Sequence, residues 1–223
     1  LRCIIRESMT TPSFKTILFM GSTRNAPAPW GGPKRLGDRV LKFVMDRIET
    51  HNAGANNIPF DVEVFDPVAM ECFHPVLGNP TYFQKPGDVS DALKACSEKI
   101  AAADCYLVVT PEYNHSIPHG LTNMMNQFGG SKYGYKPSGC VCYSGGPLGG
   151  SRVAQALRPY LSELGCLPVS KQLVIPSAGD VLNEDGTIQG ENARLEKQVT
   201  SFLAQVAWWS EATQRMRAMK GTP

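Results

Sequence analysis

The chain has 223 residues, of which 42% are apolar and 19% are charged, and its formal net charge is +2. This composition is typical of a globular protein and excludes a disordered or fibrous chain. No basic run is dense enough to bind a nucleic-acid backbone, and no apolar stretch approaches the roughly 20 residues that cross a bilayer. We therefore expect neither a nucleic acid nor a membrane as a partner.

The first residues, LRCIIRESMTTPSFK, contain neither the long apolar core nor the cleavage site of a secretory signal. We interpret residues 1–14 as an N-terminal extension. The remainder has no internal repeat, low-complexity segment or linker, so we expect residues 15–223 to form a single domain.

Short apolar runs alternate with helical patterns along this domain. The apolar runs predict five strands, at residues 15–20, 60–66, 105–110, 139–144 and 169–176. Apolar residues spaced three or four apart predict helices at residues 37–50, 89–100, 117–129, 151–165 and 195–206. Strands that alternate with helices in this way indicate a parallel sheet with helices on both faces.

The cysteines indicate a reducing compartment rather than a disulfide framework. There are seven of them, an odd number, and no Cys-x-x-Cys occurs. We therefore expect free thiols and a cytoplasmic protein. We expect no metal site either, because the histidines show no ligand-like spacing with cysteines or carboxylates; they are His51, His74, His115 and His119.

In a parallel sheet, ligands bind beyond the carboxyl ends of the strands where the strand order reverses, which directs attention to three loops. The loop after the first strand is Gly-Ser-Thr-Arg, residues 21–24. Its hydroxyls, its guanidinium and the amides of a following helix start would suit a phosphate. An ordinary polar turn would have the same sequence, and neither common nucleotide-binding glycine motif is present.

The other two loops carry groups that suit a flat ring. Pro111, Glu112, Tyr113, Asn114 and His115 follow the third strand, and they offer an aromatic face and hydrogen-bonding groups. The alternative is a surface turn in which Asn114 is a helix cap. The loop after the fourth strand, SGGPLGGS, has four glycines in eight residues, so its backbone could approach a ligand closely or could simply be flexible. Together, the three loops predict a flat cofactor that carries a phosphate.

The segments GSTR, PEYNHSIPHGLTN and YSGGPLGGSR resemble the NADPH-dependent FMN reductase family, a flavodoxin-like group that includes FMN, quinone, azo and chromate reductases. The resemblance runs from about Lys15 to Pro176. It implies a three-layer α/β/α sandwich with a five-stranded parallel sheet in the order 2-1-3-4-5. It also implies an FMN-dependent NAD(P)H oxidoreductase that passes a hydride from NADPH through bound FMN to a small-molecule electron acceptor, such as a quinone, flavin or azo compound.

The same resemblance implies roles for nine residues. Ser22 and Arg24 would hold the FMN phosphate, and the residues that would contact the isoalloxazine ring are Pro111, Glu112, Tyr113, Asn114, Ser144, Gly145 and Gly146. We expect the Glu112 carboxylate to turn away from the ring and to bind backbone or a partner chain. This chemistry requires no acid or base from a side chain, so we name no catalytic residue.

One departure from the family leaves the phosphate site incomplete. Residues 25–38 form a longer connection than the family's usual one, so the residue that completes the site stays open among Lys34, Arg35 and Arg39. Trp30 in this connection could shield the cofactor or lie exposed on the surface.

Two alternative functions and the assembly remain to be considered. A flavodoxin-type electron carrier is disfavoured because such carriers are strongly acidic, whereas this chain has a pI near 8.2. A related protein that has lost its cofactor is disfavoured by the three intact loops. We expect a homodimer or homotetramer, because the helix after the Tyr113 loop has more apolar residues than one sheet face needs: Leu121, Met124, Met125 and Phe128. The alternative is that these four residues belong to the core.

Overall fold

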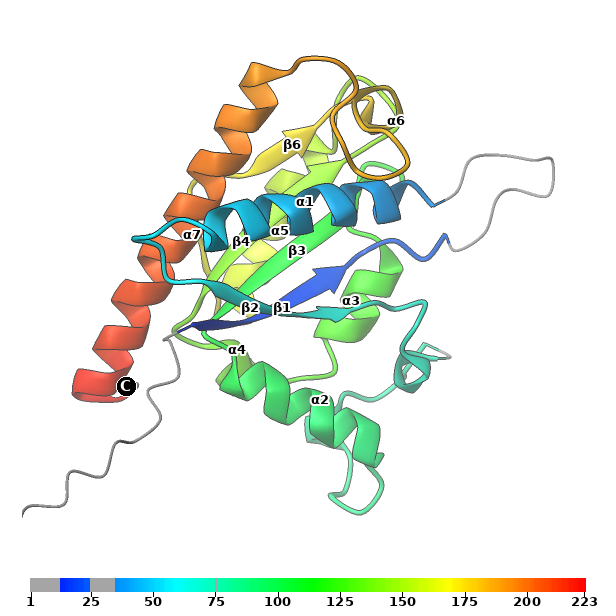
Figure 1. The fold of residues 1–223 in the computed structure, drawn as a ribbon. Helices are drawn as coiled ribbons and strands as arrows, with labels where there is room; N and C mark the ends of the chain where they lie inside the picture. The colour runs from blue at the N-terminus through cyan, green and yellow to red at the C-terminus, as the bar shows by residue number, and fades with distance from the viewer. Residues whose placement is uncertain (1–12, 25–34, 75) are drawn as a thin grey trace, which may run out of the picture.

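The computed structural model describes residues 13–24, 35–74 and 76–223 (Figure 1). A parallel sheet lies at its centre, with the strand order β2-β1-β3-β4-β5 and with β6 also paired to β4. The strands are β1 (Phe14–Met20), β2 (Phe60–Phe65), β3 (Cys105–Pro111), β4 (Pro137–Tyr143), β5 (Leu167–Pro168) and β6 (Leu173–Ile175). The predicted fold class and strand order are confirmed. The boundary between residues 14 and 15 remains a prediction, because residues 1–12 lie outside the described residues.

The burial of each strand follows its sequence pattern. Every residue of β3 and β4 is buried, as expected for continuous apolar runs in strands that are covered on both faces. The edge strand β2 instead alternates between more buried and more exposed residues. In the register, Leu18 of β1 lies opposite Val64 on one side and Leu107 on the other. The central strands therefore form the rigid base from which the loops at the carboxyl edge extend.

The last predicted strand, residues 169–176, differs from the structure. Two short strands take its place: β5 pairs with the start of β4, and β6 pairs with the end of β4. Between them the Lys171 backbone N–H donates to the Gln205 side chain at 2.7 Å instead of to β4. A partner from another element thus interrupts the ladder, so the prediction of one continuous strand was wrong.

Helices cover both faces of the sheet (Figure 1). On one face, α1 (Leu36–Asn52) and α7 (Ala193–Lys220) pack into one apolar cluster. On the other, α2 (Asp91–Ala102), α3 (His119–Met125), α4 (Gly130–Tyr133) and α5 (Ser151–Glu163) pack into a second. Three short helices lie in connections: η1 (Glu71–Phe73), η2 (Thr81–Phe83) and α6 (Ala178–Val181). The result is the expected three-layer arrangement.

The apolar residues of the helix after the Tyr113 loop belong to the core. Leu121, Met124 and Met125 have no exposed surface, and Phe128 is 1% exposed and packs edge-to-face on Phe73. The reason given above for an oligomer was therefore wrong, because β3, α2 and the segment around Phe73 already cover this surface within one chain. The oligomeric state itself stays a prediction.

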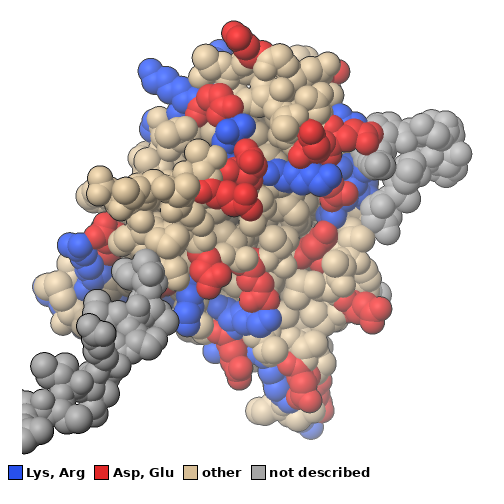
Figure 2. All heavy atoms as spheres, viewed as in Figure 1, with Lys and Arg blue, Asp and Glu red and all other residues tan. Residues whose placement is uncertain are grey.

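Among the described residues, no helix combines the length and the apolar character that spanning a membrane would require. The longest, α7, buries residues such as Val199 and Phe202 against the sheet. On the face seen in Figure 2, acidic and basic side chains are interspersed and form no large patch of one sign.

The contact between α7 and β4 depends on a glycine in the middle of the strand. A Cβ atom at Gly139 would lie 2.7 Å from Cζ of Phe202, closer than two carbon atoms can approach. Gly139 therefore lets the Phe202 ring lie directly on the sheet, and that ring is 1% exposed.

We expect Phe202→Ala to reduce the free energy of unfolding by about 3–5 kcal/mol, because it leaves a cavity over β4. The matched control is Gln198→Ala, an exposed position on the same helix, which should change it by less than about 0.5 kcal/mol. Urea unfolding of the full chain measures both values. Equal effects of the two substitutions would show that α7 is not held by this contact.

Candidate functional site

The three loops identified from the sequence meet at the carboxyl edge of the sheet. The Gly21 N–H donates to the Val109 carbonyl at 2.9 Å, so the loop after β1 begins beside the end of β3. The Ser22 hydroxyl and the Tyr113 hydroxyl are 3.0 Å apart, which joins the first loop to the second. The Glu112 N–H donates to the Tyr143 carbonyl at 3.0 Å, which joins the second loop to the third. The structure therefore brings together residues that lie far apart in the sequence.

The first loop presents one cation to the open side. Ser22 is 3% exposed, and its hydroxyl oxygen accepts a hydrogen bond from the Arg24 N–H at 3.4 Å. The Arg24 guanidinium lies over the Tyr113 ring, 4.5 Å from its centroid, a cation–π contact. Arg24 is exposed, and no carboxylate pairs with it within the described part of the chain. Its N–H groups are thus free to bind an anion.

Arg35, one of the three cations considered for the phosphate site, binds a carboxylate instead. Its Nη1 and Nη2 atoms donate to the two Asp66 oxygens at 2.5 and 2.9 Å, and Nη2 also donates to the Ser22 carbonyl. Burial would lower the pKa of Arg35, but the hydrogen bond and charge of Asp66 outweigh it and raise that pKa. Arg39 donates to the carbonyls of Gly179 and Leu182. Lys34, like Trp30, lies outside the described residues.

Two buried donors behind Ser22 have no hydrogen-bond partner among the described residues: the Tyr143 hydroxyl and Nε of Arg35. A Cβ atom at Gly37 would lie 2.7 Å from the Tyr143 oxygen and 3.2 Å from Cβ of Ser22, so this hydroxyl lies at the first turn of α1. Burial raises the pKa of Tyr143, which keeps the hydroxyl protonated. Unpaired buried donors are rare unless a ligand or water completes them. The Tyr143 hydroxyl fits a nearby phosphate. Sequence patterns did not point to Tyr143, because it ends an apolar strand.

The loop after β3 is a tight turn rather than a helix cap. The N–H and C=O groups of Tyr113 and Ser116 bond to each other at 3.2 and 2.9 Å. Between them, Asn114 and His115 have φ angles of 49° and 62°, the left-handed conformation that both central residues of a type I′ turn require. Helix α3 begins only at His119, so Asn114 does not cap it. Left-handed residues other than glycine cost energy and concentrate at ligand sites.

The four glycines of the loop after β4 serve two purposes. A Cβ atom at Gly145 would meet nothing within 4 Å, and one at Gly146 only the Ser144 hydroxyl at 4.0 Å, so this side of the loop is open to close approach. Gly149 and Gly150 instead have φ angles of 65° and 81°. A Cβ atom at either of them would lie 2.8 Å from other backbone atoms. A flat ligand therefore has access to the first half of the loop.

The Glu112 carboxylate turns toward α5, as expected. Its two oxygens accept hydrogen bonds from the Arg152 side chain at 2.9 Å and from the backbone N–H groups of Arg152 and Val153 at 3.0 and 3.4 Å. Burial would raise the pKa of Glu112, but these hydrogen bonds outweigh it and hold that pKa below its ordinary value. The carboxylate is thus ionised at neutral pH and committed to α5.

The fold and these loops define a flavodoxin-like protein with a candidate site for a flat cofactor that carries a phosphate. The chain belongs to the NADPH-dependent FMN reductase family, whose model matches residues 14–180. Membership in this family identifies it as an FMN-dependent NAD(P)H oxidoreductase, as predicted. Within the described residues, no group of three or more His, Cys, Asp or Glu side chains is placed to hold a metal ion.

Known proteins similar to this chain include several reductases. A 2-hydroxy-1,4-benzoquinone reductase from Burkholderia sp is 30% identical over 138 residues, which cover 59% of this chain and 74% of that protein. A quinone reductase from Escherichia coli K12 is 31% identical over 122 residues, which cover 49% of this chain and 62% of that protein. The structure of FerB, a flavoenzyme NAD(P)H:(acceptor) oxidoreductase from Paracoccus denitrificans, matches with a TM-score of 0.66 at 18% identity, over 89% of this chain and 97% of FerB. That structural likeness shows the fold alone.

We expect Arg35→Ala to destabilise the FMN-free protein by about 3 kcal/mol or more, because it leaves the Asp66 carboxylate without its partner. Arg24→Ala is the matched control and should leave the stability of the FMN-free protein nearly unchanged, because Arg24 is exposed. Urea unfolding without FMN measures both. If Arg35→Ala weakened FMN binding without affecting the FMN-free protein, Arg35 would be a phosphate ligand instead of a brace.

Proposed function

We propose that the protein passes reducing equivalents from NADPH through bound FMN to a quinone. The observation that carries this proposal is the convergence of the three loops at one edge, with an exposed guanidinium at one end and an open glycine backbone at the other. The names of the relatives support the acceptor class, since two of those compared above are quinone reductases. An azo compound is the second candidate, because an NADPH azoreductase from Bacillus sp. is 28% identical over 105 residues.

At the phosphate end, we assign Ser22 and Arg24 to the FMN phosphate and add the Tyr143 hydroxyl. Arg24 supplies the charge, and the Tyr113 ring beneath it restricts its position. Ser22 contributes a hydroxyl that is already fixed by Tyr113. The start of α1 lies beside these groups, and the positive end of a helix dipole favours an anion there.

At the ring end, the contacts come mainly from backbone. Pro111 ends β3 and fixes the direction of the chain, so that the following residues lie along the cofactor ring. The remaining residues assigned to this end are Glu112, Tyr113, Asn114, Ser144, Gly145 and Gly146. FMN, when bound, supplies the redox chemistry, and the protein supplies position and electrostatics. The groups named here bind and orient, and none of them is required to transfer a proton.

The direct test is a spectroscopic one on the purified protein. The flavin absorbance should appear in the visible spectrum, bleach on anaerobic addition of NADPH, and return when a benzoquinone is added. A bound flavin that NADPH leaves coloured would indicate an electron carrier, and a protein that binds no FMN would refute the proposal. Replacing the quinone by an azo dye compares the two acceptor classes directly.

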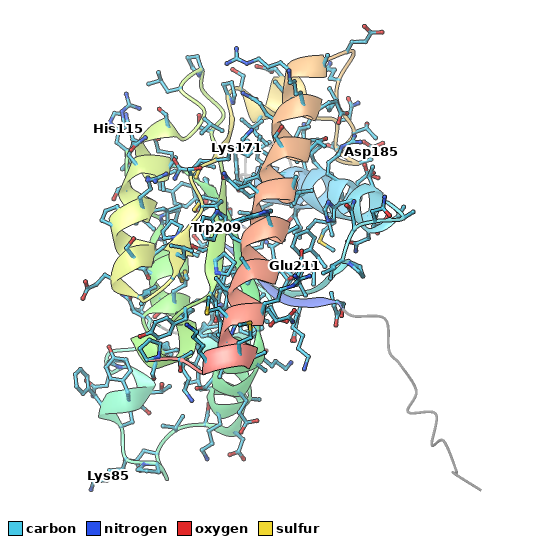
Figure 3. The ribbon with its side chains drawn as sticks, turned by 90° about the vertical axis from the view of Figure 1, so that its left-hand side faces the viewer. Lys85, His115, Lys171, Asp185, Trp209 and Glu211 are labelled. Carbon is cyan, nitrogen blue, oxygen red and sulfur yellow. The ribbon has the colours of Figure 1, made fainter. Side chains whose placement is uncertain are left out.

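We expect Arg24→Ala to weaken FMN binding roughly 10- to 150-fold, because a charge-assisted contact is worth roughly 1.5–3 kcal/mol. Lys171→Ala is the control, since Lys171 is an exposed cation on another loop (Figure 3). Fluorescence titration of the FMN-free protein measures both dissociation constants. Equal affinity of Arg24→Ala and the parent chain would remove Arg24 from the site.

Two further proposals concern the setting of the protein. We propose a cytoplasmic location, which is supported by the six cysteines among the described residues, all of which are free thiols. We also propose that residues 15–223 form a single FMN-binding domain, which is supported by the family match to residues 14–180 and by the packing of α7 on the sheet beyond them.

We propose a homodimer or homotetramer that forms through the outer face of α7. Trp208 and Met219 are 62% and 74% exposed on the side of α7 opposite its buried residues. If two copies of α7 lay antiparallel, each Trp208 would face Met219 of the other copy, a favourable sulfur–aromatic contact. The same arrangement would place Glu211 near Arg215 of the other copy; within one chain these two side chains form an ion pair.

Sedimentation velocity on the full chain should give a mass above the 24.3 kDa of one chain. Trp208→Glu should lower the mass to that of one chain, because the substitution would bury a carboxylate in the interface. Phe83→Glu is the control, at an exposed aromatic residue outside α7. A parent protein of 24.3 kDa at every concentration would contradict the oligomer. An assembly that survives Trp208→Glu would contradict the α7 interface.

A further inference from the structure

Glu112 contacts both ends of the glycine-rich loop at residues 144–151. Its backbone N–H donates to the carbonyl of Tyr143, the residue that precedes the loop, at 3.0 Å. Its carboxylate accepts from the N–H groups of Arg152 and Val153, which follow the loop, at 3.0 and 3.4 Å. One residue of the β3 loop therefore closes the β4 loop at both its start and its end.

Backbone hydrogen bonds hold the loop in addition to the contacts of Glu112. Inside it, the Ser144 hydroxyl donates to the Gly146 carbonyl at 2.8 Å, and the Gly149 N–H approaches the same carbonyl at 3.4 Å. From outside, the Ser177 N–H donates to that carbonyl at 2.9 Å, and the Ala178 N–H donates to the Ser144 carbonyl at 2.9 Å. The Ser144 N–H in turn donates to the Ile175 carbonyl at 3.4 Å. Glycine loses more conformational entropy on ordering than any other residue, so a loop with four glycines depends on how its ends are held.

The first turn of α5 has no side-chain cap from its own loop. The residue before the helix, Gly150, has no side chain, and no side chain of the loop caps the first turn. A serine or aspartate cannot replace Gly150, because its Cβ atom would lie 2.8 Å from the Tyr143 backbone nitrogen. The cap comes instead from a carboxylate forty positions earlier in the chain, in the other loop that faces the proposed ring site. This arrangement ties the two loops to each other.

We propose that Glu112 is a positioning residue that sets the spacing between the β3 loop and the glycine-rich loop, so that both meet the two edges of the FMN ring. This inference rests on the proposed function. The carboxylate side chain is 7% exposed, and its hydrogen bonds go to α5, so it acts through the backbone of Arg152 and Val153. Arg152 adds an ion pair, but its own side chain is 40% exposed and contributes less.

The test compares three variants of the full chain. Glu112→Ala removes every side-chain contact, Glu112→Gln keeps one oxygen that can accept from the α5 backbone, and Arg152→Ala removes only the ion pair. In the FMN-free protein, we expect Glu112→Ala to speed amide hydrogen exchange in residues 144–151 roughly tenfold or more, with β1 and β3 unchanged. Glu112→Gln should give a smaller change, and Arg152→Ala the smallest.

With FMN bound, the same order should appear in the flavin. We expect Glu112→Ala to shift the visible spectrum and to slow reduction by NADPH roughly 10- to 100-fold, because the ring would no longer be held in one position. The FMN dissociation constant should stay within roughly threefold of the parent value, because the phosphate contacts are untouched.

Each outcome decides the proposal. Unchanged exchange in residues 144–151 of Glu112→Ala would overturn it, even if the parent protein binds FMN and oxidises NADPH. Faster exchange throughout the chain, with an unchanged flavin spectrum, would also overturn it, because Glu112 would then serve stability alone. Should Glu112→Ala not fold, Glu112→Gln carries the same comparison. If the parent protein binds no FMN, the proposed function fails, and the exchange experiment still judges whether Glu112 holds the loop.

Discussion

The buried guanidinium of Arg35 connects the two loops that follow β1 and β2. It forms a bidentate pair with Asp66, directly after β2, and it also donates to the Ser22 carbonyl, directly after β1. Because α1 begins at the next residue, the same contact fixes where that helix starts. The position of the Ser22 hydroxyl, and through it that of the Tyr113 hydroxyl, depends on this pair. Parallel strands bring the loops to one edge, and Arg35 gives that edge a defined shape.

Two of the carboxylates near the site are paired with arginines. Asp66 pairs with Arg35 behind the first loop, and Glu112 pairs with Arg152 behind the glycine-rich loop. Both carboxylates thus face away from the open side, where they would repel a phosphate. Arg24 is left exposed above Tyr113. Among the described residues, the open side therefore presents the Arg24 guanidinium, hydroxyls and backbone amides, a combination that favours an anionic ligand without burying an unpaired charge.

The sequence was sufficient to predict the parts of this molecule that local patterns determine. Continuous apolar runs gave β1, β3 and β4, and the rule for ligands at the carboxyl edge then gave the three loops. The role of Arg35 could not be predicted, because a loop arginine can pair with a phosphate or with a carboxylate, and Asp66 only looked like the end of an alternating strand. The role of the Tyr143 hydroxyl could not be predicted either, because its ring belongs to an apolar run and only the fold shows where the hydroxyl lies.

Two predictions were wrong, the reason for an oligomer and the continuous last strand, because both depended on contacts between distant elements. Met124 and its neighbours show a helical apolar pattern, but such a pattern does not say whether the covering surface belongs to the same chain or to another. The break between β5 and β6 likewise depends on Gln205, a residue of α7. The sequence of either segment alone contains no trace of its partner, so only the assembled fold could correct these predictions.

The polarity of the parallel layers gives the two edges of the sheet opposite chemistry. At the carboxyl edge, helices such as α1 begin, and their positive ends favour an anion beside Ser22 and Arg24. At the amino edge, α2 ends, and the Lys136 ammonium donates to the carbonyls of Ile100 and Ala101 at 3.0 and 2.6 Å. Burial and the charge of Arg217 lower the pKa of Lys136 to about 8, so the ammonium is still present at neutral pH. At the amino edge, the Lys136 ammonium therefore balances the negative end of α2. At the carboxyl edge, the positive end of α1 favours binding of an anion from solution.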